Sequence, residues 1–134
     1  MANSLSNKGE EYMLFGDGSS DGAIARLTTA VLLYTSASTP NKDGTGFTEV
    51  ANGNGYVTGG TARTIANWTF SIVSTRGQVV MADVVYTASG GQILNIAGAY
   101  LVDTGANVLA WWERTPVTLD DTDTLTLDDL TIRL

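Results

Sequence analysis

The chain has 134 residues, 43% of them hydrophobic, with seven basic and fourteen acidic side chains, a net charge of −7, and neither His nor Cys. This length and composition predict one globular domain over residues 1–134 and exclude disulfides, thiolate catalysis and metal sites built on Cys or His. The acidic balance opposes wrapping a phosphate backbone or docking on an anionic membrane, so we expect no nucleic-acid partner and no membrane partner. The Gly-rich segments match no phosphate-binding loop, and we expect no cofactor.

The N-terminal segment, residues 1–16, is expected to form a helical arm. Leu5, Tyr12 and Phe15 make an apolar stripe at helical spacing, which predicts a short helix over residues 4–15. The segment has no basic start followed by an apolar run, so it does not read as a signal peptide, and we expect synthesis in the cytoplasm. An arm of this kind could reach a neighbouring molecule, and its three apolar side chains are candidate interface residues.

A first strand is expected over residues 27–35, whose sequence LTTAVLLYT is apolar on both faces and therefore typical of a central strand. Residues 36–55 follow as the longest polar stretch, with several Asn-Gly and Asp-Gly turn signals. Loops of this length inside a compact domain are often functional. Phe47 and Val50, the only large apolar residues of the loop, are therefore candidate contact residues.

Short strands are expected from Tyr56 to the C-terminus, separated by Gly- and Asp-rich breaks. Their ranges are 56–66, 67–73, 77–87, 92–103, 107–114 and 122–133. This spacing predicts an all-β fold, an antiparallel β-sandwich of jelly-roll type with the one short N-terminal helix.

Alternation within these strands predicts which side chains face the core. Trp68, Phe70 and Ile72 alternate with polar residues and are expected to be core. Further along, we expect one face to carry Leu94, Ile96, Tyr100 and Val102. The last strand changes parity between Leu127 and Leu130, which predicts a bulge or tight bend at Asp128 and Asp129.

The carboxylates are the only side chains that could support metal binding or acid–base catalysis. The acidic cluster of the C-terminal region lacks the Gly and the distal Glu of a calcium loop, so turn capping is the favoured interpretation over a calcium site. No two carboxylates stand at a spacing that indicates a glycosidase pair. We therefore expect no catalytic residues, no metal site and no enzymatic activity. The acidic cluster consists of Asp120, Asp121, Asp123, Asp128 and Asp129.

Trp111 and Trp112 are adjacent in an expected strand, so their rings should point to opposite faces. One ring could then enter the core, while the other could anchor a protein interface or stack against a sugar. The alternative is that both rings are covered within the fold. Both residues are candidate interface positions.

Three stretches of the chain resemble a family of small tailed-phage virion proteins that often carries the label phage tail fibre or tail protein. They are TEVANGNGYVTGG (48–60), GGQILNIAGAYLVDTGANVLAWW (90–112) and RTPVTLDDTDTLTLDDLTIRL (114–134). The shared motifs are turns and strand ends, so the resemblance implies a fold and a virion setting. The chain departs from the family pattern after Tyr56, where the usual Arg two residues later is replaced by Thr58; the Arg is missing, or its role passes to Arg63.

These observations together lead to one hypothesis and one rival. The hypothesis is a non-enzymatic capsid decoration or cement protein on the outer capsid surface, with the major capsid protein and further copies of itself, as a homo-oligomer, as partners. The rival is a tail fibre or tail-tip component that binds a host surface glycan. A glycan-degrading enzyme that uses carboxylates alone is a third, weaker reading.

Overall fold

The computed structural model describes residues 2–7, 24–74 and 76–133, with the side chains of residues 2, 3, 70, 72, 76 and 77 left aside. The protein is all-β, and its strands are antiparallel. The strands are β1 (Ala2–Leu5), β2 (Ala30–Thr35), β3 (Thr61–Ala62), β4 (Trp68–Val73), β5 (Arg76–Met81), β6 (Val84–Thr87), β7 (Ile93–Val102), β8 (Val108–Leu119), β9 (Thr124–Leu127) and β10 (Leu130–Arg133). The described helices are α2 (Ile24–Leu27) and the 3-10 helix η1 (Ile65–Asn67).

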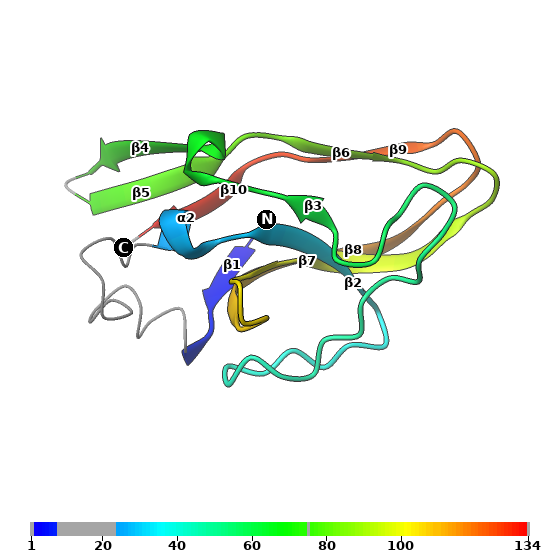
Figure 1. Cartoon of the computed structure of the whole chain (residues 1–134), viewed down its shortest axis with the longest axis horizontal. Helices are drawn as coiled ribbons and strands as arrows, with labels where there is room; N and C mark the ends of the chain where they lie inside the picture. Colours follow the sequence, from blue (N-terminus) through cyan, green and yellow to red (C-terminus); the bar gives the residue numbers. More distant parts are fainter. Residues whose placement is uncertain (1, 8–23, 75, 134) are drawn as a thin grey trace.

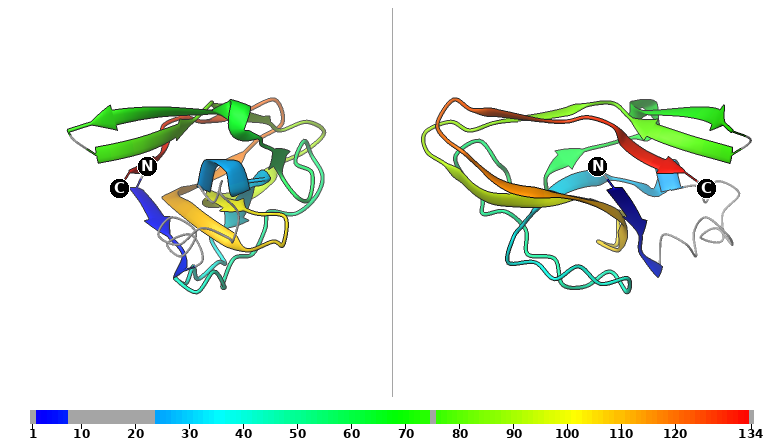
Figure 2. Two further views of the ribbon diagram at one scale, coloured as in Figure 1. Left: turned by 60° about the vertical axis from the view of Figure 1, so that its left-hand side comes forward. Right: turned by 180° about the vertical axis from the view of Figure 1, so that it is seen from behind.

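The strands form two layers (Figures 1 and 2). One layer is a five-stranded sheet in the order β1-β8-β7-β2-β3. The second layer holds the three-stranded sheet β10-β5-β4 and the pair β6-β9. β2 lies between β7 and β3 and is buried on both faces, which confirms the expectation of a central strand. The jelly-roll connectivity stays a prediction.

A single antiparallel ribbon, folded back on itself, builds most of both layers. Along it β5, β6 and β7 pair in turn with β10, β9 and β8. The register is continuous from Gln78 opposite Arg133 to Val84 opposite Leu127, and the pairing goes on, with register shifts between β7 and β8, to Val102 opposite Val108. The ribbon passes from one layer to the other around residues 88–92 and 120–123, at the right-hand end of Figure 1.

The core lies between the layers. The inner face of the five-stranded sheet contributes Leu33, Leu101 and Trp112, and the second layer contributes Met81 and Leu130, all fully buried. The Trp112 indole also ties the layers together, because its Nε1 donates a hydrogen bond of 3.3 Å to the backbone oxygen of Thr131 in β10. Trp68 belongs to the same cluster, as predicted; the side chains of Phe70 and Ile72 lie outside the described part.

The prediction of a helix from residue 4 is wrong at its start. Residues 2–5 form strand β1, with Ser4 opposite Trp111 and Leu5 opposite Ala110. Strand pairing wins here because the edge of β8 offers backbone partners, and the buried Ser6 continues the attachment through its amide and hydroxyl to Leu109 and Val108. The first residues are thus part of the sheet and do not form a free arm. Tyr12 and Phe15 lie outside the described residues.

Two expected strand boundaries are also wrong. Of residues 56–66 only Thr61 and Ala62 form a strand, because Gly59 and Gly60 adopt positive φ and turn the chain. A Cβ on Gly60 would meet the Val31 carbonyl oxygen at 2.0 Å, so only Gly fits this approach. β8 continues to Leu119, past the end expected at residue 114. β1 covers only residues 110–113 of that edge, so the missing amide of Pro116 costs no ladder bond to β1.

The expectation that Leu94, Ile96, Tyr100 and Val102 share one face of a strand is wrong, because the side chains of β7 do not alternate regularly. Its register with β8 shifts on both sides of Ile96, and Asn95 has a φ of 54°. As a result Ile96 joins the inner cluster, Tyr100 lies on the outer face, and Leu94 is 54% exposed.

The parity break in the last strand is confirmed. β9 ends at Leu127 and β10 begins at Leu130, and both leucines are buried. Asp129, between them, has a φ of 55°, and its carboxylate accepts a 2.9 Å hydrogen bond from the Thr131 hydroxyl. The bend rotates the chain so that both segments present their leucines to the core.

Candidate functional site

The loop over residues 36–48 folds against itself. The Thr39 amide donates to Gly46 at 2.7 Å and the Asn41 amide donates to Thr45 at 3.0 Å. At the tip, the hydroxyl and amide of Thr45 donate to Asp43, and these bonds hold the pKa of the Asp43 carboxyl below its ordinary value. The loop is therefore a built element with its own hydrogen bonds.

The side chain of Phe47 packs this loop against the outer face of the five-stranded sheet. Its ring stacks on Tyr100 at 4.8 Å between centroids and meets Tyr34 and Trp111 edge-on at 5.4 and 5.6 Å. We call Tyr34, Phe47, Tyr100 and Trp111 the outer aromatic cluster. Edge-to-face and stacked pairs of this kind add roughly 0.5–1.5 kcal/mol beyond the burial of area.

Tyr34 reaches across β7 to the next strand. Its hydroxyl donates a 3.2 Å hydrogen bond to the Trp112 carbonyl, and its ring lies over Gly98, where an added Cβ would meet the Tyr34 hydroxyl at 2.4 Å. Burial, together with the negative charge of Glu113, raises the pKa of Tyr34. Burial raises the pKa of Tyr100 to about 12. Both phenols are thus held neutral.

Both adjacent tryptophans are covered within the fold. Trp112 is fully buried between the layers and Trp111 is 7% exposed beneath Phe47. Val50 is also buried, in the inner cluster. The expectation that an exposed Trp or Val50 serves as a contact surface is therefore corrected: opposite strand faces are both apolar here, and the loop covers the second one.

The remaining predicted contact residues lie at two places. Leu5 is partly buried against the inner cluster at the β1 edge, and Phe47 is partly buried in the outer aromatic cluster. The structure does not bring these two together into one surface patch.

The second half of the loop is anchored by Glu49 and Tyr56. The Tyr56 hydroxyl donates to the Glu49 carboxylate at 2.8 Å and accepts from the Leu33 amide at 3.1 Å, in place of a missing strand partner. The same carboxylate oxygen accepts the Gly59 amide at 2.7 Å. Burial raises the pKa of Tyr56, and the Glu49 carboxylate raises it further. Glu49 is therefore a structural acceptor.

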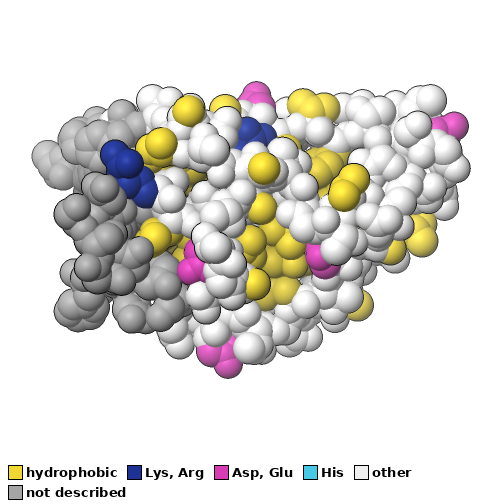
Figure 3. All heavy atoms as spheres, viewed as in Figure 1, with side chains coloured by type: hydrophobic (Ala, Val, Ile, Leu, Met, Phe, Trp, Pro, Cys, Tyr) yellow, Lys and Arg dark blue, Asp and Glu magenta, His cyan; other side chains and the backbone are white. Residues whose placement is uncertain are grey.

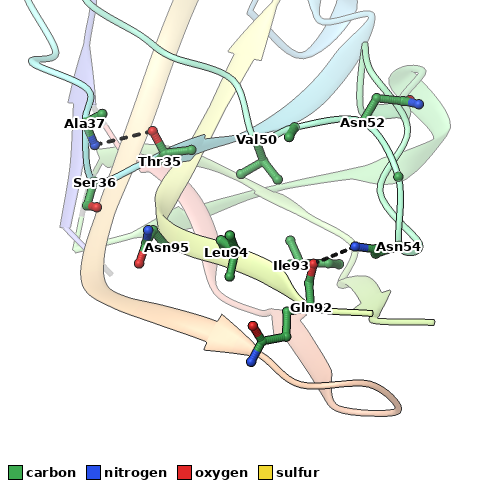
Figure 4. Close-up of a pocket in the computed structure, with 12 residues that line it drawn as sticks. Thr35, Ser36, Ala37, Val50, Asn52, Asn54, Gln92, Ile93, Leu94 and Asn95 are labelled. Carbon is green, nitrogen blue, oxygen red and sulfur yellow. Dashed lines mark hydrogen bonds between the residues drawn. The ribbon is translucent and has the colours of Figure 1, made fainter. Parts of the chain in front are cut away.

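A cavity of about 290 Å³ opens beside this anchor (Figure 4). Three segments line it: the end of β2 with residues 35–37, the loop at 50–54, and the start of β7 at 92–95. Its polar side chains are hydroxyls and the amides of Asn52, Asn54, Gln92 and Asn95, and none of its lining residues is ionisable. Leu94 and the buried Val50 and Ile93 supply apolar surface.

The acidic residues at the ribbon's bend cap turns, which is the interpretation that the sequence favours over a calcium site. Asp121 accepts the Gly90 amide at 2.9 Å, and Asp120 accepts the Gln92 side-chain amide at 2.6 Å. Asp123 accepts the Asp120 amide at 3.1 Å. Within the described residues, no three side chains of acidic, His or Cys type gather where they could hold a metal ion. On the face drawn in Figure 3 the acidic side chains are scattered singly.

Comparisons with protein families, curated proteins and solved structures find no match to this chain. None of the described helices is long and apolar enough to cross a membrane.

Sequence reasoning missed the cavity. Asn52 and Asn54 stand out in the sequence only as turn signals, and Asn95 lies in an expected regular strand. One signal was available for Asn95: an amide residue inside an apolar strand tolerates positive φ and can mark a bulge. The meeting of the loop with the start of β7 depends on tertiary structure.

Proposed function

We propose that this chain is a non-enzymatic structural protein of a tailed-phage virion, and that it decorates the outer capsid surface, where it stabilises neighbouring capsid subunits. Its partners are the major capsid protein and further copies of the same chain. The virion setting comes from the three stretches that resemble the phage family, and the capsid role from the acidic, strand-built character of the domain.

One observation supports a scaffold role for those stretches. Each of them contains a carboxylate that braces a turn: Glu49 in the first, Asp103 in the second and Asp121 in the third. Asp103 accepts the amides of Gly105 and Asn107, both at 2.9 Å, at the tip of the β7-β8 hairpin. The residues that carry the resemblance thus maintain a shape, which is what a cement protein needs.

The charge of the chain favours the outside of a capsid over its inside. A net charge of −7 repels packaged nucleic acid, which binds proteins through clustered Lys and Arg. Attachment would then rest on apolar and backbone contacts, repeated over a symmetric lattice. Such attachment should tolerate salt, because salt screens charges over about 10 Å at 0.1 M and leaves apolar contacts in place.

The rival hypothesis, a tail component that binds a host glycan, requires an exposed Trp. Both tryptophans of the pair are buried.

The test is rebinding to particles that lack the protein. Purified chain is mixed with such capsids and sedimented at low and high salt, with tailless capsids and isolated tails as separate samples. The proposal expects saturable co-sedimentation with tailless capsids that persists at high salt. Binding to isolated tails alone, or no binding to capsids, would contradict it.

A further inference from the structure

We propose that the cavity of Figure 4 is a binding site for a neutral saccharide of one or two sugar units. This inference goes beyond the decoration role and does not depend on it, because the site belongs to the isolated chain.

The cavity offers hydrogen-bonding groups that are still free. Within the described part of the chain, the Asn52 Nδ2 and the side-chain amide of Asn95 have no hydrogen-bond partner, although the Asn52 Oδ1 and the Asn95 backbone are engaged. A side-chain amide both donates and accepts, which matches a sugar hydroxyl, since that group also does both. Figure 4 shows Asn95 on one side of the cavity and Asn52 and Asn54 on the other.

An apolar surface lies between these amides. Leu94 is 54% exposed, so its side chain is open to a ligand, and Figure 4 places it between Asn95 and Asn54. A sugar ring has a C–H face that can pack on such a side chain while its hydroxyls meet the amides around it. The combination of a few placed polar groups with an apolar floor is typical of small-molecule sites.

The polar groups are held in place before any ligand arrives. The Thr58 amide donates to Asn52 Oδ1 at 2.9 Å, which fixes the direction of the Asn52 Nδ2. Asn54 Nδ2 donates to the Gln92 carbonyl at 2.9 Å, drawn as a dashed line in Figure 4. Preorganised groups of this kind bind with a smaller loss of conformational entropy.

Asn95 is fixed through its backbone. Its amide donates to the Thr118 hydroxyl at 3.1 Å, and its carbonyl accepts the Ser36 amide at 3.0 Å. Asn54 and Asn95 both have a φ of 54°, a region that residues other than Gly seldom occupy. Asn54 is fixed through its backbone as well, because its carbonyl accepts the Ser89 amide at 3.0 Å.

The residues that line the cavity also argue against a charged ligand. No Lys or Arg lines the cavity to pair with a carboxylate or phosphate group, and the chain as a whole is acidic. Charged sugars such as sialic or glucuronic acid should therefore be rejected. A volume of about 290 Å³ lies at the small end of ligand sites, which limits the ligand to one or two sugar units.

The experiment uses the whole chain, labelled with ¹⁵N, titrated with neutral mono- and disaccharides: glucose, galactose, mannose, N-acetylglucosamine, maltose, lactose and chitobiose. Sialyllactose and glucuronic acid serve as charged probes. We expect at least one neutral sugar to shift the side-chain signals of Asn52 and Asn95 saturably, and the charged probes to bind at least tenfold more weakly.

Two variants remove one contribution each without disturbing the backbone. Asn95→Gly keeps a residue that accepts positive φ and removes the amide, and Leu94→Ala removes the exposed apolar surface. Each should weaken binding about fivefold or more, the effect of losing one net hydrogen bond or one apolar contact. Val85→Ala is the matched control, since Val85 is 57% exposed on β6 and does not line the cavity.

Unchanged melting temperatures for these variants show that any loss is local. The proposal is overturned if no neutral sugar shifts these signals saturably, if the charged probes bind as well as the neutral ones, or if binding survives both cavity variants unchanged. It is equally overturned if the NMR signals of the residues that line the cavity shift with an extended peptide and with none of the sugars.

Discussion

The two faces of the five-stranded sheet are both apolar, but they are covered in different ways. The inner face, with Leu33, Leu101 and Trp112, is covered by a second layer of strands that belongs to the same folded ribbon. The outer face is covered by one loop, through Phe47 and the loop's own hydrogen bonds. The difference shows that burial alone does not define the structural core: strand ladders build the inner covering, whereas the outer covering is one loop that places a single ring, Phe47, on the sheet.

The largest effect is expected on the inner face. Trp112→Ala should lower the free energy of unfolding by about 3–5 kcal/mol, because it leaves a cavity between the layers and removes the hydrogen bond to Thr131. Urea unfolding followed by circular dichroism measures it. A loss below about 1 kcal/mol would mean that the layers are not joined at Trp112.

On the outer face, Phe47→Ala should cost less, about 1–2 kcal/mol, because Phe47 is only partly buried and the sheet beneath does not depend on it. The Phe47→Ala variant should also expose Trp111, which is measured as a red shift of tryptophan fluorescence while the circular dichroism spectrum stays unchanged. Phe47→Leu is the control and should keep most of the covering. A loss as large as that of Trp112→Ala would remove the distinction between the two faces.

Alkaline pH should weaken the outer face through its tyrosines. The folded pKa of Tyr100 is raised from 10.0 to about 12, so the neutral phenol's contribution is fully present below pH 10 and is lost as the pH rises toward 12. We expect the free energy of unfolding to fall over that range. Tyr100→Phe should make the fall shallower, and an equally steep fall in that variant would contradict the assignment.

A smaller effect is expected at the bend between β9 and β10. Asp129 has a φ of 55°, so Asp129→Val should cost about 1–2 kcal/mol, whereas Asp129→Asn should be close to neutral. Thermal melts of the two variants measure the difference. Equal melting temperatures would mean that the chain absorbs the parity change elsewhere.

Much of the fold could be predicted from the alternation of apolar and polar residues. The central strand at β2, the strand at Trp68 and the parity break at residues 128–129 all follow from side-chain periodicity, because a strand with one buried face fixes its own register. Asp120 and Asp121 were likewise recognised as turn caps from their residue type.

The failures share one physical cause, which is pairing or packing between residues far apart in sequence. Leu5 has helical spacing to Tyr12, but the free edge of β8 draws it into a strand. Trp111 has no local signal that a loop sixty residues earlier will cover it, and the amide of Asn95 enters a cavity only because β7 is irregular. Local propensity is overridden where the tertiary context supplies better partners.

The proposed decoration role is tested most directly by the copy number of this chain in purified virions, measured by quantitative mass spectrometry against the major capsid protein. The account predicts a fixed small-integer ratio to the capsid subunits, retained in tailless capsids and after washing at high salt. A few copies per virion that leave with the tail would contradict it.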